Sequence, residues 1–263
     1  MIPLDLNDKV ALVTGVTAGI GAGIAAVLAE AGCHVAGCGR SDAGSEGARV
    51  FSKNVASFGR KSLYVKADIT RESDIRSLVD QTASEFGKID ILISNAGVNV
   101  FRGARDCSTR DFDYNTDLNL KSHWLISQYC RENLAKSDNG LIVIITSNHA
   151  YRTIPGCFPY NVTKAALVGL VNALALEWGP EIRVIGLAPG FIETESGERY
   201  YASFRDPFRE KQSTINRHPL KRLGTVAEIG GICAFLATEY ARFISGTTFL
   251  VDGGRSAVMQ DEA

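Results

Sequence analysis

Tyr160 and Lys164 lie four residues apart at the start of an apolar run, a spacing that brings a phenol and an ammonium group together in a helix. Four helical residues make roughly 400° of turn, so both side chains share one face, about 6 Å apart along the axis. At an effective dielectric constant of about 20, a Lys charge favours the phenolate by up to roughly 3 kcal/mol, or about two pKa units. Such a Tyr would exchange protons near neutral pH. By itself, the spacing is more typical of a packed aromatic ring beside an amine that extends to solvent.

The elements that must position this pair alternate along the chain. Short runs rich in Val, Ile and Leu, without polar alternation, are separated by segments of helical periodicity. This pattern predicts an α/β fold, a Rossmann-type doubly wound parallel sheet of about seven strands with helices on both faces. The expected strands are 10–13, 34–39, 63–67, 89–94, 141–145, 182–187 and 247–251, and the expected helices are 20–31, 41–58, 72–86, 112–134, 160–178 and 227–237.

We expect residues 1–263 to form one domain with an insertion at about 191–218. The chain has 263 residues, 45% of them hydrophobic and 22% charged, so it can bury a substantial core. The 191–218 segment is polar and aromatic, and it is long for a connection in a compact domain. We interpret it as a lid over a substrate site; the alternative is a solvated surface insertion.

Charge and composition argue against several classes of function. The net charge is −1 and Lys and Arg are scattered, so nothing favours nucleic acid binding. No apolar stretch is long enough to span a bilayer, and residues 1–9 lack the features of a signal peptide, so we expect a cytoplasmic protein without membrane attachment. The six cysteines form no C-x-x-C pair and the four histidines no cluster, which predicts reduced thiols and no metal site.

Gly15, Gly19 and Gly21 form a G-x-x-x-G-x-G loop between the first expected strand and the first expected helix. This spacing differs from the commoner G-x-G-x-x-G dinucleotide pattern. Glycines nevertheless let the backbone turn tightly and approach a pyrophosphate, whose charge is favoured by the amides at a helix N-terminus. We therefore predict a phosphate site here; the alternative is a turn that serves packing alone.

The residues after the second expected strand should select the cofactor. An acidic residue there binds the ribose hydroxyls of NAD, whereas an Arg accommodates the 2′-phosphate of NADP. Gly39 would leave room where the acid would sit, and Arg40 offers a planar fork suited to phosphate, which favours NADP over NAD. Asp42 is the competing signal, although it is equally suited to cap the following helix.

With these residues identified, the chain resembles the classical short-chain dehydrogenase/reductase family over nearly its whole length. The matching features, in the family's order, are the glycine loop, Asn95-Ala96-Gly97, Asn119, Ser147, Tyr160-x-x-x-Lys164, Pro189-Gly190 and residues 246–254. Ser147 precedes Tyr160 by 13 positions, which is the family's usual interval. The departures are Ser94, where many members carry another Asn, and Ala18, where a basic residue would be a second marker of NADP.

The resemblance implies a catalytic group of Asn119, Ser147, Tyr160 and Lys164 and a hydride transfer between a nicotinamide cofactor and an alcohol or carbonyl (EC 1.1.1.-). Tyr160 would exchange a proton with the substrate oxygen, and Ser147 would hold that oxygen. Lys164 would lower the pKa of the phenol and bind the nicotinamide ribose, and Asn119 would support a water linking Lys164 to solvent. The chemistry agrees, because the cofactor carries the electrons while the protein supplies orientation and a proton. Read alone, Ser147 suggests a hydrolase nucleophile, but its surroundings lack the G-x-S-x-G elbow.

The resemblance also implies cofactor contacts and an assembly. Asp68 would contact the adenine, with a helix-start carboxylate as a compatible alternative, and Thr194 would contact the nicotinamide carboxamide. The predicted cofactor set is Gly15, Thr17, Gly19, Ile20, Gly21, Arg40, Ser41, Asp68, Ile69, Asn95, Ala96, Gly97, Tyr160, Lys164, Pro189, Gly190, Ile192 and Thr194. The family usually forms tetramers through helices 112–134 and 160–178 and the C-terminal helix and strand, so we expect a homotetramer.

Residues flanking the catalytic group combine hydrogen-bonding groups with aromatic rings; they are Asn99, Asn148, His149, Tyr151, Phe158 and Glu193. The predicted substrate contacts are Asn99, Ser147, His149, Phe158, Tyr160 and Glu193, although His149 could equally be structural. Such a wall favours a sugar, polyol or other small polar alcohol, with a 3-ketoacyl compound or small ketone as the alternative. A non-catalytic NADP-binding scaffold is less supported, because all four active-site residues are kept. A nucleotide-sugar dehydratase or epimerase usually has a longer C-terminal region.

Overall fold

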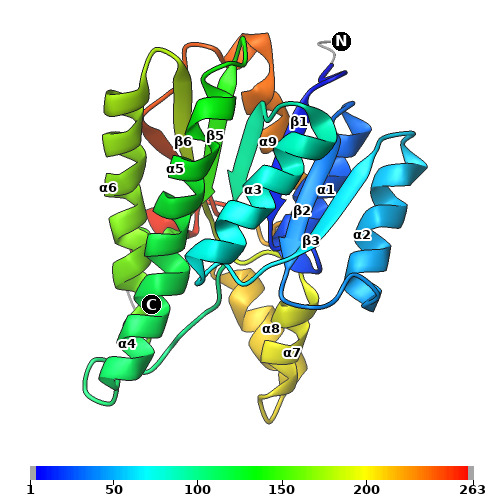
Figure 1. Cartoon of the computed structure of the whole chain (residues 1–263). Coiled ribbons are helices and arrows are strands. Elements are labelled where there is room, and N and C mark those ends of the chain that lie inside the picture. The colour runs from blue at the N-terminus through cyan, green and yellow to red at the C-terminus, as the bar shows by residue number, and fades with distance from the viewer. Residues whose placement is uncertain (1–3, 260–263) are drawn as a thin grey trace.

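Seven parallel strands form one sheet in the computed structural model, which describes residues 4–259. The strand order is β3-β2-β1-β4-β5-β6-β7, so the chain returns to the centre after β3 and continues on the other side of β1 (Figure 1). This order confirms the predicted Rossmann-type doubly wound sheet. The strands are β1 (Val10–Thr14), β2 (His34–Gly39), β3 (Ser62–Lys66), β4 (Ile91–Ser94), β5 (Gly140–Ile145), β6 (Ile182–Pro189) and β7 (Thr247–Val251).

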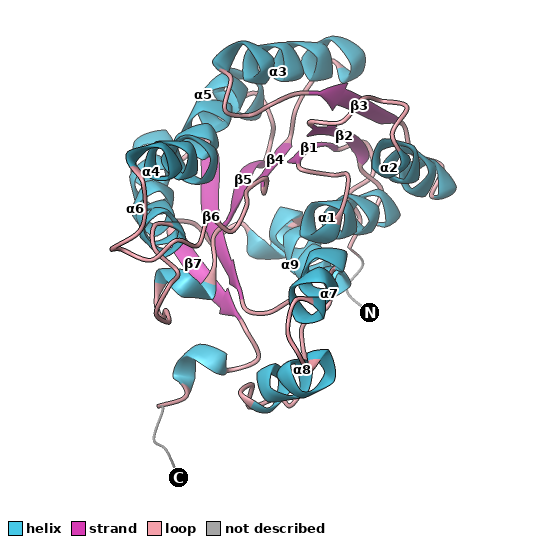
Figure 2. Cartoon of the chain, turned by 90° about the horizontal axis from the view of Figure 1, so that it is seen from below, coloured by secondary structure: helices cyan, strands magenta, loops and turns pink. Residues whose placement is uncertain are grey.

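Helices cover both faces of this sheet (Figure 2). α1 and α9 pack together on one face, and α3, α5 and α6 cover the other. The α-helices are α1 (Gly19–Glu30), α2 (Glu46–Ser57), α3 (Glu72–Phe86), α4 (Thr109–Thr116), α5 (Ser122–Leu134), α6 (Tyr160–Trp178), α7 (Glu195–Ala202), α8 (Pro207–Asn216) and α9 (Val226–Ala237). Short helical turns are η1 (Asp117–Lys121), η2 (Asn148–Ala150), η3 (Glu239–Ala241) and η4 (Arg255–Ala257).

The central strands are apolar throughout because both of their faces are buried. Val13 packs with Ile24 of α1 and Ile229 of α9 in one core cluster. The neighbouring Leu12 points to the opposite face and packs in a second cluster that includes Ile75 of α3. Successive side chains of a strand thus enter different cores, which explains the missing polar alternation.

α2 begins at Glu46, five residues later than predicted. The N-cap residue is Ser45, and the Asp42 carboxylate instead pairs with Lys66 Nζ at 2.7 Å. The interpretation of Asp42 as an N-cap is therefore wrong. Tyr64 contributes to the difference, because its hydroxyl donates to the Ser41 carbonyl at 2.8 Å and holds the chain outside the helix.

The helical region expected at 112–134 begins earlier and is irregular. Ser108 caps α4, its hydroxyl accepting from the Asp111 N–H at 3.1 Å. Between α4 and α5 the chain makes one π-helical turn, η1, which contains the buried Asn119. Single π-turns inside α-helices frequently mark functional sites.

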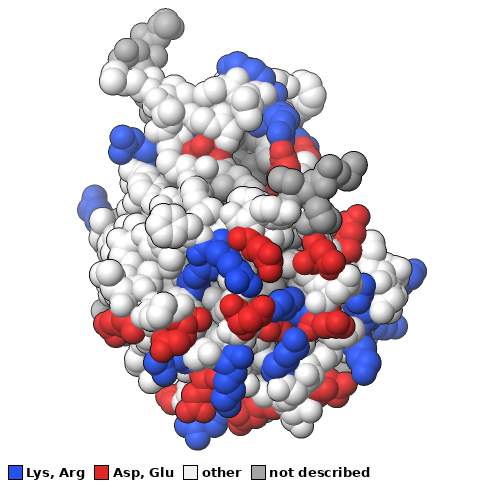
Figure 3. Space-filling view, turned by 90° about the horizontal axis from the view of Figure 1, so that it is seen from above, with Lys and Arg blue, Asp and Glu red and all other residues white. Residues whose placement is uncertain are grey.

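The 191–218 segment contains two helices, α7 and α8, beyond the carboxyl ends of the strands (Figures 1 and 2). The opposite face of the molecule carries interspersed acidic and basic side chains (Figure 3). Within residues 4–259, no helix has the length and apolar character needed to cross a membrane.

Candidate active site

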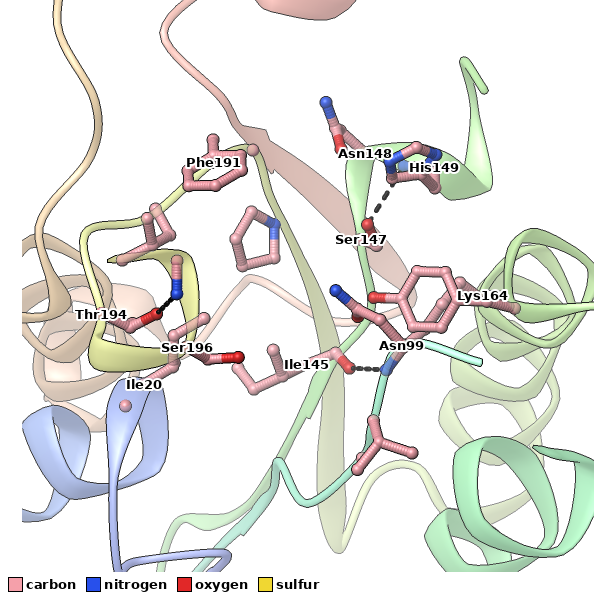
Figure 4. Close-up of a pocket in the computed structure, with 18 of the residues that line it drawn as sticks. Ile20, Asn99, Ile145, Ser147, Asn148, His149, Lys164, Phe191, Thr194 and Ser196 are labelled. Carbon is pink, nitrogen blue, oxygen red and sulfur yellow. Dashed lines mark hydrogen bonds between the residues drawn. The ribbon is translucent and has the colours of Figure 1, made fainter. Parts of the chain in front are cut away.

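A cavity of about 1340 Å³ lies at the carboxyl ends of the strands. It extends from the glycine loop and Arg40 to Tyr160 and onward to α7, α8 and η4. Figure 4 shows Ile20, Thr194 and Ser196 on one side and Ser147, His149 and Lys164 on the other. The cavity thus joins the predicted cofactor and substrate regions.

The glycine loop has the geometry that phosphate binding requires. Gly15 and Gly19 adopt φ values of 76° and 61°, a left-handed conformation that other residues rarely take. A Cβ at Gly21 would lie 2.2 Å from the Gly15 carbonyl oxygen, so that glycine serves the packing of the loop. Ala18, the N-cap residue of α1, offers no side-chain acceptor to the first-turn amides. Those amides are suited to hold a pyrophosphate.

Thr14, at the end of β1, fixes the loop after β4. Its hydroxyl accepts from the N–H groups of Asn95 and Ala96, both at 2.9 Å. In turn, Asn95 Nδ2 donates a hydrogen bond to the Thr14 carbonyl at 2.9 Å. Thr14 was not among the predicted site residues; the signal that could have identified it is a hydroxyl side chain directly before the glycine loop.

Asn119 holds the next part of the same loop. Its Oδ1 accepts from the Val98 N–H at 3.1 Å, and its Nδ2 donates to the Val98 carbonyl at 2.9 Å and to Asn115 Oδ1 at 2.7 Å. A Cβ at Gly97 would lie 2.5 Å from Asn119 Oδ1, so only glycine fits there. The observed contacts of Asn119 therefore position the 97–98 backbone.

Ser147, Tyr160 and Lys164 meet where β5 ends and α6 begins. Lys164 Nζ donates to the Ile145 carbonyl at 2.9 Å and lies 5.7 Å from the centre of the Tyr160 ring (Figure 4). Ser147 Oγ accepts from the His149 N–H at 3.1 Å. All three side chains are buried, and all three line the cavity.

The protein's own groups do not bring the phenol's pKa toward neutrality. Burial raises the pKa of Tyr160 to about 12, although the Ser147 hydroxyl lowers it. Burial also lowers the pKa of Lys164 to about 7, which weakens the positive charge that was expected to favour the phenolate. The predicted shift of Tyr160 toward neutral pH is therefore wrong for the protein alone.

The wall around Tyr160 is aromatic and polar. The Phe101 ring contacts the Tyr160 ring edge-on, with centroids 5.3 Å apart, and the His149 ring lies 6.1 Å from it. His149 Nδ1 lies 3.1 Å from Thr153 Oγ1, so this His is both hydrogen-bonded and part of the wall. Phe101 was missed because it precedes α4 in an irregular loop with no periodic signal.

Most of the predicted site residues line this one cavity. Those that do are Gly15, Thr17, Gly19, Ile20, Arg40, Asp68, Ile69, Asn95, Ala96, Gly97, Asn99, Ser147, Asn148, His149, Tyr160, Lys164, Pro189, Gly190, Ile192 and Thr194. Asp68 does not cap α3, because the N-cap residue of that helix is Arg71. The Asp68 carboxylate instead accepts from the Thr70 N–H at 3.0 Å.

The remaining predicted residues lie outside the cavity lining. Phe158 packs against Phe112, with ring centroids 6.0 Å apart, and Glu193 is exposed, its N–H donating to the Gly224 carbonyl. Their prediction as substrate contacts is not supported by this placement. The other residues not among the lining are Gly21, Ser41, Asn119 and Tyr151.

Comparisons with known proteins agree with this geometry. A family model described as enoyl-(acyl carrier protein) reductase matches residues 15–256. Human dehydrogenase/reductase SDR family member 4 is 36% identical over 255 residues, which is 95% of this chain and 88% of the human protein. The chain belongs to the short-chain dehydrogenase/reductase family. Membership implies an oxidoreductase that uses a nicotinamide dinucleotide.

Two further family relatives carry more specific names. A 2-dehydro-3-deoxy-D-gluconate 5-dehydrogenase of Dickeya dadantii is 33% identical over 252 residues, covering 95% of this chain and 96% of that protein. The ligand-free structure of Thermoplasma acidophilum aldohexose dehydrogenase superposes with a TM-score of 0.88 at 27% identity, over 98% of both chains.

Proposed function

We propose that this short-chain dehydrogenase/reductase interconverts a hydroxyl and a carbonyl group on a small polar molecule, with a sugar or polyol as the first candidate. The observation that carries the proposal is the meeting of Ser147, Tyr160 and Lys164 in the cavity that also contains the glycine loop and Arg40. The 191–218 segment would act as the lid of this site.

The chain's own groups account for proton transfer and orientation. In reduction, the Tyr160 hydroxyl would donate a proton to the carbonyl oxygen while the Ser147 hydroxyl donates a hydrogen bond to the same atom. Bound nicotinamide supplies the hydride. In oxidation, Tyr160 would accept the proton of the alcohol. Asn119 would contribute by fixing the loop at Val98, and its role in supporting a water for Lys164 remains a prediction.

NADP is the proposed cofactor. A Cβ at Gly39 would lie 2.7 Å from Thr17 Cγ2 and 2.9 Å from the Tyr64 hydroxyl, so this position does not leave the room that we expected. An acidic side chain of the kind that selects NAD would need Thr17 and Tyr64 to shift, which supports the proposal of NADP. Asp42 is engaged by Lys66, and Arg40 lines the cavity with its guanidinium available for a 2′-phosphate.

Two observations support a sugar-like substrate. Asn99, Asn148 and His149 line the cavity beside Tyr160 and offer hydrogen bonds to hydroxyl groups. The gluconate-derivative and aldohexose dehydrogenases among the relatives act, by their names, on sugar-derived molecules. A 3-ketoacyl compound or small ketone is the second candidate, because Phe101, Phe191 and Tyr200 also line the cavity.

The test is a spectrophotometric screen of aldoses, polyols, small ketones and keto esters with NAD(H) and NADP(H) side by side. A reductase consumes one NADPH for each carbonyl reduced. A non-catalytic scaffold would bind NADPH without consuming it, and an epimerase or dehydratase would convert its substrate without net consumption. Either of those results would overturn the proposal.

A further inference from the structure

Besides Arg40 and Arg199, three arginines line the cavity. Arg152 follows η2, Arg217 is the C-cap residue of α8, and Arg255 begins η4. Three segments that are distant in sequence therefore bring a guanidinium to one end of one cavity. This end includes part of the 191–218 segment and lies away from Arg40.

These positive charges are poorly neutralised by the protein. No ion pair within residues 4–259 includes Arg152, Arg217 or Arg255, whereas Arg199 in the same lining pairs with Glu195 at 3.7 Å. The only acidic side chain lining this end, in the part of the chain that the structure describes, is Glu210. Burial first, and then the charge of Arg217, lower the pKa of Arg255, whereas the charge of Asp252, outside the cavity lining, raises it.

Two buried polar atoms at the same end have no partner in residues 4–259; they are Ser256 Oγ and His218 Nε2. His218 is 3% exposed, and its Nδ1 lies 2.7 Å from the Thr214 carbonyl, which orients the ring. Buried polar atoms in native proteins normally have a partner, which a water or a bound molecule would supply here. A hydroxyl beside unpaired guanidinium groups is a donor set suited to an oxyanion.

This end of the cavity adjoins the reaction centre. The His149 ring lies 6.1 Å from the Tyr160 ring. Arg255 and His149 line the same cavity, and the charge of Arg255, after burial, lowers the pKa of His149. A single small molecule with its carbonyl at Tyr160 would therefore extend past His149 toward Arg255.

We propose that Arg152, Arg217 and Arg255 bind an oxyanion group of the substrate, so that this enzyme acts on a small anionic hydroxy or keto compound, with its reacting carbon at Ser147 and Tyr160. The inference rests on the proposed oxidoreductase function and adds the charge of the substrate. An Arg fork binds a carboxylate or a phosphate through two parallel hydrogen bonds, and these two sources of the oxyanion are separated by experiment.

The experiment compares matched charged and neutral substrates with the full-length enzyme and NADPH. Levulinate and 2-oxobutanoate are each paired with their methyl ester, and dihydroxyacetone phosphate is paired with dihydroxyacetone. We expect kcat/KM for one charged member to exceed that for its neutral partner by tenfold or more. A carboxylate subsite favours the keto acids, and a phosphate subsite favours dihydroxyacetone phosphate. Equal values across all pairs would overturn the inference while leaving the oxidoreductase function intact.

Variants test whether these arginines cause the preference for the charged substrate. Arg255→Met and Arg217→Met keep the aliphatic stem, and each should reduce the charged-to-neutral ratio of kcat/KM about 10- to 100-fold. Arg205→Met, an exposed Arg between α7 and α8 outside the cavity lining, is the matched control and should leave this ratio unchanged. A ratio that survives both cavity variants would refute the assignment.

A binding measurement separates this inference from the proposed function. Calorimetric titration of the same acids and of dihydroxyacetone phosphate into Tyr160→Phe, saturated with NADPH, reports binding without turnover. Anion binding that is weakened by Arg255→Met, in an enzyme that reduces no carbonyl, would support the anion site and refute the oxidoreductase proposal. Absence of binding together with reduction of neutral carbonyls would refute the anion site alone.

Discussion

The Asn119 side chain satisfies both backbone groups of Val98, accepting from its N–H at 3.1 Å and donating to its carbonyl at 2.9 Å. A residue of the π-turn thereby fixes the loop after β4, against which the cavity is built. A Cβ at position 97 would clash with the Asn119 side chain, so this loop needs Gly97 to pack against Asn119.

Asn119→Ala should lower both stability and activity. Two backbone groups would lose their partner, at a cost of about 1–3 kcal/mol, which corresponds to a melting temperature lower by roughly 2–10 °C in a chain of this size. Calorimetry and kcat/KM measure the two effects, with the exposed Asp113→Asn on α4 as control. A variant with wild-type melting temperature and turnover would show that Asn119 is dispensable for the loop.

Tyr160→Phe should lose turnover yet keep cofactor binding. In the proposed reaction the phenolic proton is delivered to the substrate oxygen, and removal of a general acid costs about 10²- to 10⁴-fold in rate. The ring itself stays, so its packing against Phe101 is preserved. Turnover measures the loss, and fluorescence titration with NADPH measures the retained binding. Activity within a few-fold of wild type would exclude Tyr160 as the acid.

Arg40→Ala should weaken NADPH binding much more than NADH binding. A charge-assisted bond to the 2′-phosphate contributes about 1.5–3 kcal/mol, or roughly 10- to 100-fold in Kd, and NADH lacks that phosphate. Equilibrium titration with each cofactor measures the difference, and Arg49→Ala on the exposed side of α2 serves as control. Equal losses for the two cofactors would remove the preference for NADP.

Lys164→Met should be inactive. Its gain in stability over the wild type should be largest at acidic pH. Burial lowers the pKa of Lys164 from 10.5 to about 7, so between these values the unfolded chain binds a proton that the folded chain lacks. The free energy of unfolding of the wild type therefore rises as the pH rises from 7 to 10.5. Below pH 7 the destabilisation caused by burying Lys164 is constant and at its largest.

The difference in melting temperature between Lys164→Met and wild type should consequently shrink as the pH rises from 6.5 to 9.5. Lys53→Met on α2 is the control, because the Lys53 side chain is exposed. A difference that is independent of pH would mean that Lys164 titrates near its ordinary value.

A four-chain assembly is the fifth prediction. Leu176 of α6 is 84% exposed, and Phe243 is fully exposed. Leu250 lies on the edge strand β7, and its side chain is 46% exposed. Apolar side chains exposed together on an edge strand and a neighbouring helix are typical of subunit interfaces. Light scattering should give the mass of a tetramer, and Leu176→Arg should lower it, whereas Val50→Arg on α2 should not. A monomeric wild type would contradict the prediction.

The fold was predictable because local pattern and global structure agree. α6 begins at Tyr160 and ends at Trp178, and β7 spans Thr247–Val251, both as predicted, because apolar periodicity and flanking breakers mark these segments. The start of α2 was not predictable, because it depends on Tyr64 holding the Ser41 carbonyl from a different strand. Contacts of this kind leave no signal in the local sequence.

The candidate site was predictable only where its chemistry resides in spaced side chains. Ser147, Tyr160 and Lys164 line one cavity, and their catalytic roles stay a prediction. The pKa of Tyr160 is raised instead of lowered, because residue spacing does not reveal burial. Arg217 and Arg255 come from separate segments and carry no motif, so their convergence needed the fold.

The N-terminus of α1, where Ala18 offers no side-chain cap, would link the protein's lifetime to its cofactor. If a pyrophosphate completes that helix end, the folded chain is stabilised by mass action, by about 2.7 kcal/mol at a ligand concentration one hundred times the Kd. The same increment reduces the globally unfolded population about a hundredfold, and with it the exposure of the chain to proteases. The nicotinamide pool would then set the abundance of this enzyme as well as its rate.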